Sequence, residues 1–231
     1  MIGFYNYTVY LTYVSLMVSG VGLYFAASGR PLIAIICLMT SGLCDMFDGK
    51  IARTRHKSTE MERNFGIQLD SLADIVCFGV LPAMIGKSFF DAFVEEKSIS
   101  LSDYALALNH AALCALGCLL ILCALIRLAY FNVTEEERQK TTDAHRTPYI
   151  GLPVTTGSLI FPLAYAMTYV LATFLPARIA MYLYALVLLV VAVCFIAPFS
   201  VRKPHGKALI GLAFVGLAEI GFIIWVVLNL R

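Results

Sequence analysis

Apolar runs long enough to cross a bilayer recur along almost the whole chain. A transmembrane helix needs about 20 mostly apolar residues, and such runs occur at 7–28, 31–53, 66–88, 104–131, 150–173, 178–199 and 207–230. Of the 231 residues, 60% are hydrophobic and only 14% are charged, whereas a soluble domain has roughly 25% charged residues. The sequence therefore predicts an all-α integral membrane protein, a polytopic helical bundle built as one membrane domain over residues 1–231.

Composition also excludes some classes of partner and fold. The net charge of +2 is too small to indicate a nucleic-acid-binding protein. The seven cysteines all fall in apolar segments and form no Cys-x-x-Cys pair, which favours buried thiols over a disulfide framework or a structural zinc site.

Basic residues are distributed unevenly between the predicted loops. One side, made of the loops after the second, fourth and sixth runs, holds Lys50, Arg53, Arg55, Lys57, Arg63, Arg138, Lys140, Arg146, Arg202, Lys203 and Lys207. The other side holds Arg30, Lys87, Lys97, Arg178 and Arg231. Because cytoplasmic loops carry the excess of Lys and Arg, we expect a multi-pass protein of the cell membrane with a cytoplasmic N-terminus.

Four aspartates interrupt the second and third apolar runs near this basic side. A helix advances about 100° per residue, so Asp45, Asp48, Gly49 and Ala52 share one helix face, with Arg53 at its edge. The next helix carries a second stripe, consisting of Gly66, Asp70 and Asp74. Two antiparallel helices joined by a short loop can bring both faces together, which would place four carboxylates in one small volume just below the membrane surface.

Such a volume needs positive charge, because carboxylates at that depth repel each other and lose hydration. Divalent cations such as Mg²⁺ prefer oxygen ligands, and four aspartates can hold two ions that clamp a phosphate during a displacement. Ion pairing that only fixes helix packing is a weaker alternative, since Arg53 can neutralise one aspartate but not four. A carboxylate-based cation transporter also stays open, although its acids should be spread through the bilayer depth.

These residues form a known pattern. Asp45-x-x-Asp48-Gly49-x-x-Ala52-Arg53 followed by Gly66-x-x-x-Asp70-x-x-x-Asp74 resembles the signature of the CDP-alcohol phosphotransferases. The segments "LDSLAD", "RLAYFN" and "GLPV" look like those of the membrane-bound phosphatidylserine synthases within that family. The loop 54–65 between the two halves of the signature is longer than the family usually has, so its conformation is the part that the resemblance explains least.

The resemblance implies a fold and a set of site residues. The family core has six spans, expected here over about 7–200, with the run at 207–230 as an additional C-terminal helix. The implied roles are two Mg²⁺ or Mn²⁺ ions on the four aspartates, with Asp74 as the general base. The CDP moiety would lie against Asp48, Gly49, Ala52, Arg53 and Gly66, and L-serine against Arg127, Asn132 and Tyr149.

The implied activity is transfer of a phosphatidyl group from CDP-diacylglycerol to L-serine in the bilayer, which gives phosphatidylserine and CMP. A related enzyme with glycerol phosphate or inositol phosphate as acceptor stays open, as does an archaetidylserine synthase that uses an ether lipid. The family is often dimeric, so a homodimer is possible on the same grounds. Glu219, an acid inside the last apolar run, has no role in this scheme.

Overall fold

The computed structural model describes residues 3–4, 9–52, 59–141, 148–202 and 207–230, and leaves undescribed the side chains of 49–52, 138–141, 148–150, 200–202, 207–210, 212 and 213. Its helices, in chain order, are α1 (Tyr10–Ala27), α2 (Pro31–Ala52), α3 (Glu60–Asp74), the π-helical η2 (Ile75–Val80), α4 (Leu81–Glu96), α5 (Asp103–Thr141), the 3-10 turn η3 (Val154–Thr156), α6 (Gly157–Phe174), α7 (Ala177–Ala180), α8 (Leu183–Ile196) and α9 (Lys207–Asn229). The strands β1 (Pro148–Ile150) and β2 (Ser200–Arg202) form one short antiparallel pair.

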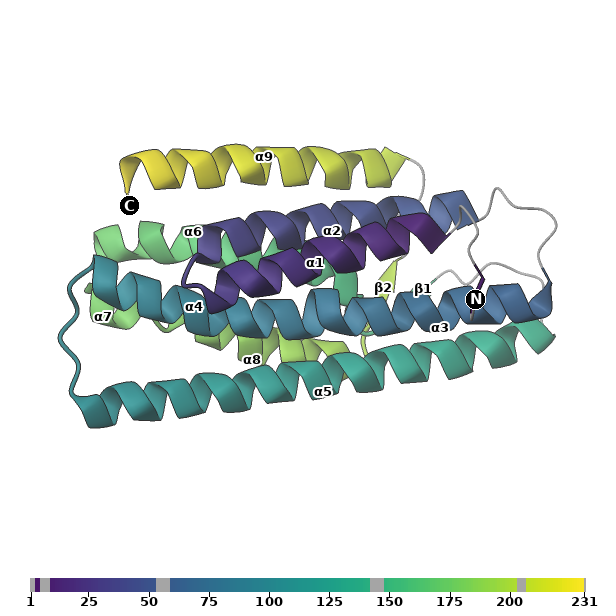
Figure 1. Ribbon diagram of the computed structural model, residues 1–231, viewed down its shortest axis with the longest axis horizontal. Coiled ribbons are helices and arrows are strands. Elements are labelled where there is room, and N and C mark those ends of the chain that lie inside the picture. The colour runs from purple at the N-terminus through teal and green to yellow at the C-terminus, as the bar shows by residue number, and fades with distance from the viewer. Residues whose placement is uncertain (1–2, 5–8, 53–58, 142–147, 203–206, 231) are drawn as a thin grey trace.

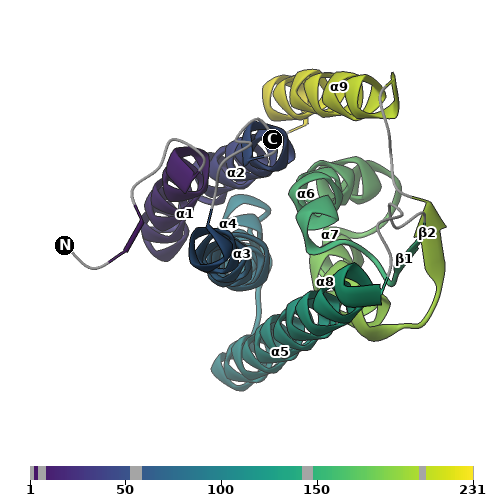
Figure 2. The same ribbon diagram turned by 90° about the vertical axis from the view of Figure 1, so that its right-hand side faces the viewer.

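The helices lie roughly along one long axis, as Figure 1 shows. The continuous rod formed by α3, η2 and α4 occupies the centre, with α1 and α2 on one side, α5 below, and α6 and α8 on the other (Figure 2). Helix α9 packs against the outer side of α6. The C-terminal ends of α2 and α5 and the strand pair lie toward the same end of the bundle (Figure 1), which we call the site end.

Within the described residues, six helical segments are long and apolar enough to cross a membrane. The predicted polytopic all-α bundle is therefore confirmed, with the two short strands as a small addition. The predicted starts of two helices were wrong by about two turns each. Helix α3 begins at Glu60 instead of residue 66, and α6 begins at Gly157 instead of residue 150.

A capping box explains the early start of α3. The Thr59 hydroxyl accepts a hydrogen bond from the Glu62 backbone N–H at 3.2 Å, and the Thr59 backbone N–H donates to the Glu62 carboxylate at 2.9 Å. Two N–H groups that the helix leaves unpaired are satisfied in this way. Residues 60–65, half of the predicted charged loop 54–65, thus belong to α3, and residues 53–58 lie outside the described part of the chain.

The helix that carries Asp70 and Asp74 changes its winding directly after Asp74. Residues Ile75–Val80 form a π-helical segment, and the Leu81 backbone N–H donates to the Val76 carbonyl. Such segments are rare and occur frequently at functional sites. Helix α4 then continues to Glu96, past the predicted end at residue 88.

Aromatic rings and small residues both contribute to the packing of the bundle. Aromatic rings form part of the core, with Phe89 in contact with the rings of Tyr165, Tyr169 and Tyr184. Small residues let the helices approach closely, and a Cβ added to Gly42 would lie 2.1 Å from the Ser158 hydroxyl oxygen. All seven cysteines are free, but Cys114 and Cys118 are exposed, whereas the sequence predicted buried thiols.

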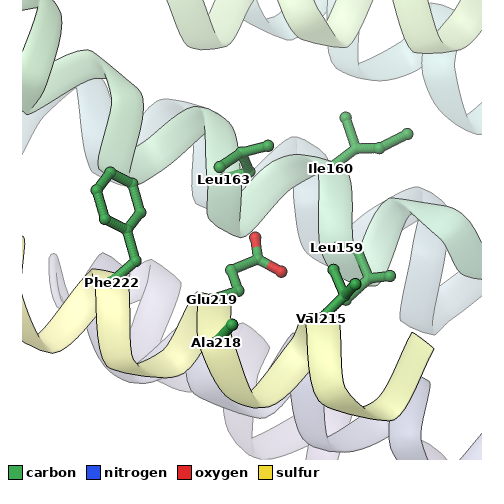
Figure 3. Close-up of a pocket in the computed structure, with 7 residues that line it drawn as sticks. All are labelled: Leu159, Ile160, Leu163, Val215, Ala218, Glu219 and Phe222. Atoms are coloured by element: carbon green, nitrogen blue, oxygen red, sulfur yellow. The ribbon is translucent and has the colours of Figure 1, made fainter. Parts of the chain in front are cut away.

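Helix α9 runs from the site end to the opposite end of the bundle, where the Lys97 ammonium donates to the Leu230 carbonyl at 3.0 Å. Its described apolar part, Phe214–Asn229, is shorter than the six candidate spans, so a seventh crossing stays a prediction. Glu219 is only 7% exposed. Its carboxyl group points from α9 toward α6 beside an otherwise apolar pocket of about 360 Å³ (Figure 3).

Candidate functional site

Three of the four predicted aspartates meet at one point. Asp45 on α2 and Asp70 and Asp74 on α3 each offer a carboxylate oxygen, and these oxygens lie within 4.8 Å of one another. The i, i+4 spacing puts Asp70 and Asp74 on one face of α3. Helix α2 runs antiparallel to α3 (Figure 1), and its Asp45 meets that face. Asp74 is buried, whereas Asp45 and Asp70 are half-buried, so the cluster is open from the side of the latter two.

Asp48, the fourth aspartate, lies beside this cluster. Its side chain is only 8% exposed and contacts the side chain of Asp70. Its Oδ2 atom accepts a hydrogen bond from the Thr12 hydroxyl of α1 at 3.3 Å. All four aspartates are therefore neighbours, although Asp48 does not offer an oxygen to the same point as the other three.

The donor set fits a hard divalent cation. Among the described side chains, no Lys, Arg or His forms a salt bridge with Asp45, Asp70 or Asp74. Three carboxylates this close would otherwise repel one another strongly in a partly dehydrated site. Carboxylate oxygens are the ligands that Mg²⁺ and Mn²⁺ prefer, so the cluster is the part of the chain best suited to hold such an ion.

The backbone beside the cluster leaves space. A Cβ added to Gly66 would meet no atom within 4 Å, and Gly66 lies one turn before Asp70 on the same stripe. A ligand held at the carboxylates could therefore approach the α3 backbone there. The surroundings of Gly49 and the side chain of Ala52 are not described, and Arg53 lies outside the described residues.

The three predicted serine ligands are placed differently. Asn132 on α5 donates through Nδ2 to the Ser71 hydroxyl at 2.8 Å, so it contacts α3 at the residue that follows Asp70. The Arg127 side chain is buried, and its Nε–H donates to the Leu152 carbonyl at 3.2 Å. Tyr149 belongs to β1, but its side chain is not described.

Two polar contacts of the site were missed by sequence reasoning. Thr12 holds Asp48, and Ser71 links Asn132 to the helix of Asp70 and Asp74. A signal existed for the first, because Thr12, Ser15 and Ser19 recur on one face of an apolar helix and all are buried. Polar residues on one face of a membrane helix indicate hydrogen bonds to a neighbouring helix.

Three relatives with a curated name resemble part of the chain. A CDP-diacylglycerol–serine O-phosphatidyltransferase of Saccharomyces cerevisiae is 36% identical over 129 residues, which cover 54% of this chain and 39% of that protein. Proteins of the same name from Helicobacter pylori and Bacillus subtilis are 27% and 29% identical, over 63% and 52% of this chain and 51% and 53% of their own lengths. The alignments thus span about 40% to half of these relatives.

A family model covers far more of the sequence. The model described as CDP-alcohol phosphatidyltransferase matches residues 5–197, from before α1 to the end of α8. The matched region contains the carboxylate cluster and ends before α9. Since the match extends over most of the sequence, the chain belongs to the CDP-alcohol phosphatidyltransferase family.

Proposed function

We propose that this protein transfers the phosphatidyl group of CDP-diacylglycerol to the hydroxyl of L-serine. The observation that carries the proposal is the meeting of Asp45, Asp70 and Asp74 inside the region that matches the family. The shared name of the three relatives supports serine as the acceptor. The phosphate-bearing acceptors remain the alternative within the same chemistry.

In this proposal the aspartates hold the reacting groups around divalent cations. Asp45, Asp48, Asp70 and Asp74 would be the ligands of Mg²⁺ or Mn²⁺, which would offset the charge of the diphosphate and of the transition state. Gly66 gives the CDP moiety access to the backbone of α3. Gly49, Ala52 and Arg53 are proposed to complete that contact, with the Arg53 guanidinium on a phosphate.

The transfer itself makes one bond and breaks one. The serine oxygen bonds to the β-phosphorus of the CDP group, the phosphorus–oxygen bond to CMP breaks, and the serine hydroxyl proton passes to a carboxylate. We assign that proton to Asp74, the buried member of the cluster. A positioned base of this kind contributes roughly 10² to 10⁴-fold in rate. Serine would enter from the half-exposed side of Asp45 and Asp70.

Residues on α5 and β1 are proposed to hold serine. Asn132 already touches the helix of the cluster. The Arg127 side chain is held by its hydrogen bond to the Leu152 carbonyl. Leu152 follows the turn at Gly151, whose φ of +76° suits glycine. The Arg127 guanidinium is the proposed partner of the serine carboxylate, with Tyr149 as a further contact.

The proposed setting is a cell membrane with the site end facing the cytoplasm. The ends of α2 and α5 and the β1–β2 pair all lie toward this end, and these segments lead into the loops that carry most of the Lys and Arg residues. Cytoplasmic loops carry that excess. The water-soluble substrate would then reach the aspartates from the cytoplasm, while the lipid substrate arrives through the bilayer.

CMP release from the purified protein tests the proposal. We expect CMP release in mixed micelles that contain CDP-diacylglycerol and Mg²⁺ or Mn²⁺, only after L-serine is added, together with a lipid product that contains serine. CMP release with glycerol 3-phosphate or inositol phosphate but not with serine would show that the acceptor is a phosphate-bearing alcohol and not serine. Absence of CMP with every acceptor, in a protein that binds and transports cations, would favour the transporter.

A further inference from the structure

Helix α1 supplies a hydrogen-bond donor to the carboxylate site, although it carries none of the family signature. The Thr12 hydroxyl lies 3.3 Å from Asp48 Oδ2. Thr12 is 6% exposed and Asp48 is 8% exposed, so bulk water has little access to either group. A hydroxyl has one O–H donor, and an ionised carboxylate is an acceptor only, which fixes the direction of this hydrogen bond.

The position of Thr12 is held by a second set of hydroxyl contacts, deeper between α1 and α2. The Ser19 and Ser41 hydroxyls lie 2.8 Å apart. The Ser15 hydroxyl donates to the Ser41 carbonyl at 3.2 Å, and the Ser41 hydroxyl donates to the Ser15 carbonyl at 3.1 Å. These bonds fix the position of α1 along the axis of α2, and the two helices lie side by side in both views (Figures 1 and 2).

Asp48 differs from the other aspartates in having this neutral donor. One oxygen faces Thr12, and the side chain also contacts Asp70. A carboxylate whose orientation is fixed by an outer hydrogen bond presents its remaining lone pairs in one direction, and the loss of such an outer partner typically costs 10- to 100-fold in metal affinity. This inference rests on the proposed function, because it assumes that the aspartates hold a divalent cation.

We propose that Thr12 is a positioning residue: its hydroxyl orients the Asp48 carboxylate for the divalent-cation site formed with Asp45, Asp70 and Asp74. The Ser15, Ser19 and Ser41 contacts belong to helix packing and act on the site only through it. The two roles are separable, since Thr12 touches a carboxylate, whereas the contacts described for Ser19 are with the Ser41 hydroxyl and the Cys77 thiol.

Matched variants and a direct binding measurement separate the roles. Thr12→Val keeps the shape and removes the hydroxyl, Thr12→Ser keeps the hydroxyl, and Ser19→Ala removes an equally buried hydroxyl from the same helix face. Free Mn²⁺ is measured by electron paramagnetic resonance during titration of each purified full-length protein in detergent micelles. The half-saturating Mn²⁺ concentration for CMP release is measured in parallel.

We expect Thr12→Val to weaken Mn²⁺ binding and to raise the half-saturating Mn²⁺ concentration by about tenfold or more, with turnover largely recovered at saturating Mn²⁺. Thr12→Ser should bind Mn²⁺ within about threefold of the unsubstituted protein, and Ser19→Ala should bind it unchanged, both well below that 10- to 100-fold loss. Melting temperatures report whether the two hydroxyl deletions lower stability by similar amounts.

Two results would overturn the positioning role while the metal site stands. One is Mn²⁺ binding by Thr12→Val equal to that of the unsubstituted protein. The other is an equal loss of binding in Ser19→Ala, which would assign the effect to helix packing. If the unsubstituted protein binds no Mn²⁺ in the presence of CDP-diacylglycerol, the proposed metal site itself fails, and the role of Thr12 fails with it.

Discussion

Two of the places where acidic side chains lie within the apolar helices contrast with each other. At the site end, Asp45, Asp70 and Asp74 come within 4.8 Å of one another and stand beside Asp48. Between α6 and α9, Glu219 stands alone, with apolar side chains such as Leu163 and Phe222 around it (Figure 3). One carboxyl group in an apolar setting can lose its charge by binding a proton, but a cluster of carboxylates is better matched by a divalent cation.

The two places differ in the number of neighbouring carboxylates, while Asp74 and Glu219 are similarly buried. Glu219 is as buried as Asp48 or Asp74, and its Oε1 atom has no hydrogen-bond partner among the described residues. It also lies outside the region that matches the family. Four changes test the contrast, in order of expected effect.

The largest effect is expected from Asp70→Asn. The substitution keeps the shape and removes one charge from the cluster, so CMP release should fall by about 10³-fold, equivalent to roughly 4 kcal/mol of transition-state stabilisation. Initial rates at saturating CDP-diacylglycerol and serine measure it. Glu219→Gln is the matched control and should retain turnover; near-normal activity of Asp70→Asn would remove the cluster from the mechanism.

Divalent cations should stabilise the fold through the same cluster. At a concentration about 100 times its dissociation constant, Mn²⁺ should add about 2.7 kcal/mol to the free energy of unfolding, seen as a higher melting temperature that a chelator reverses. Asp45→Asn should lose this response. Without metal it should be more stable than the unsubstituted protein by roughly 1 kcal/mol, because one repulsive charge is gone. A chelator-sensitive melting temperature in Asp45→Asn would contradict the model.

A smaller effect is expected from Gly66→Ala, which should raise stability slightly but weaken the binding of CDP-diacylglycerol. The added Cβ meets no atom within 4 Å, and alanine is favoured over glycine in a helix interior by about 0.5–1 kcal/mol, so the melting temperature should rise slightly. If the CDP moiety lies against this backbone, the KM for CDP-diacylglycerol should rise with little change in kcat. Improved stability with an unchanged KM would show that the nucleotide does not lie against Gly66.

The smallest effect is expected at Glu219. Glu219→Gln preserves shape and leaves a neutral polar group, so the free energy of unfolding should change by no more than about 1 kcal/mol. Its Mn²⁺ titration should match that of the unsubstituted protein, as measured by the same resonance method. Loss of Mn²⁺ binding in Glu219→Gln would show that the isolated acid and the cluster act together, and the contrast drawn here would no longer hold.

Sequence patterns predicted most of the helices and the common face of Asp70 and Asp74, because both depend on local periodicity, and the meeting with Asp45 followed from the short connection between consecutive helices. Apolar runs report burial in a bilayer, and the i, i+4 spacing of Asp70 and Asp74 fixes their common face whatever the surrounding fold. The capping box is equally local, since the Thr59-x-x-Glu62 spacing in the sequence marks the start of α3.

The remaining features depend on which helices become neighbours. The contact of Thr12 with Asp48, that of Asn132 with Ser71, and the place of Glu219 against α6 each join residues from separate helices. Periodicity shows that a polar face needs a partner without showing which one. The π-helical turn after Asp74 also has no local signature in the sequence, since it depends on how α3 and α4 pack against the rest of the bundle.

That turn is a place where the chain can lose one residue without breaking the helix. A π-helical segment accommodates one residue more than an α-helix over the same rise, so α3 and α4 are rotated against each other as if by a single inserted residue. Removal of one residue between Ile75 and Val80 would restore continuous α-helix and turn Asp70 and Asp74 by about 100° relative to the aromatic core. A single-codon deletion there should therefore give a protein that still folds but no longer brings Asp70 and Asp74 to Asp45.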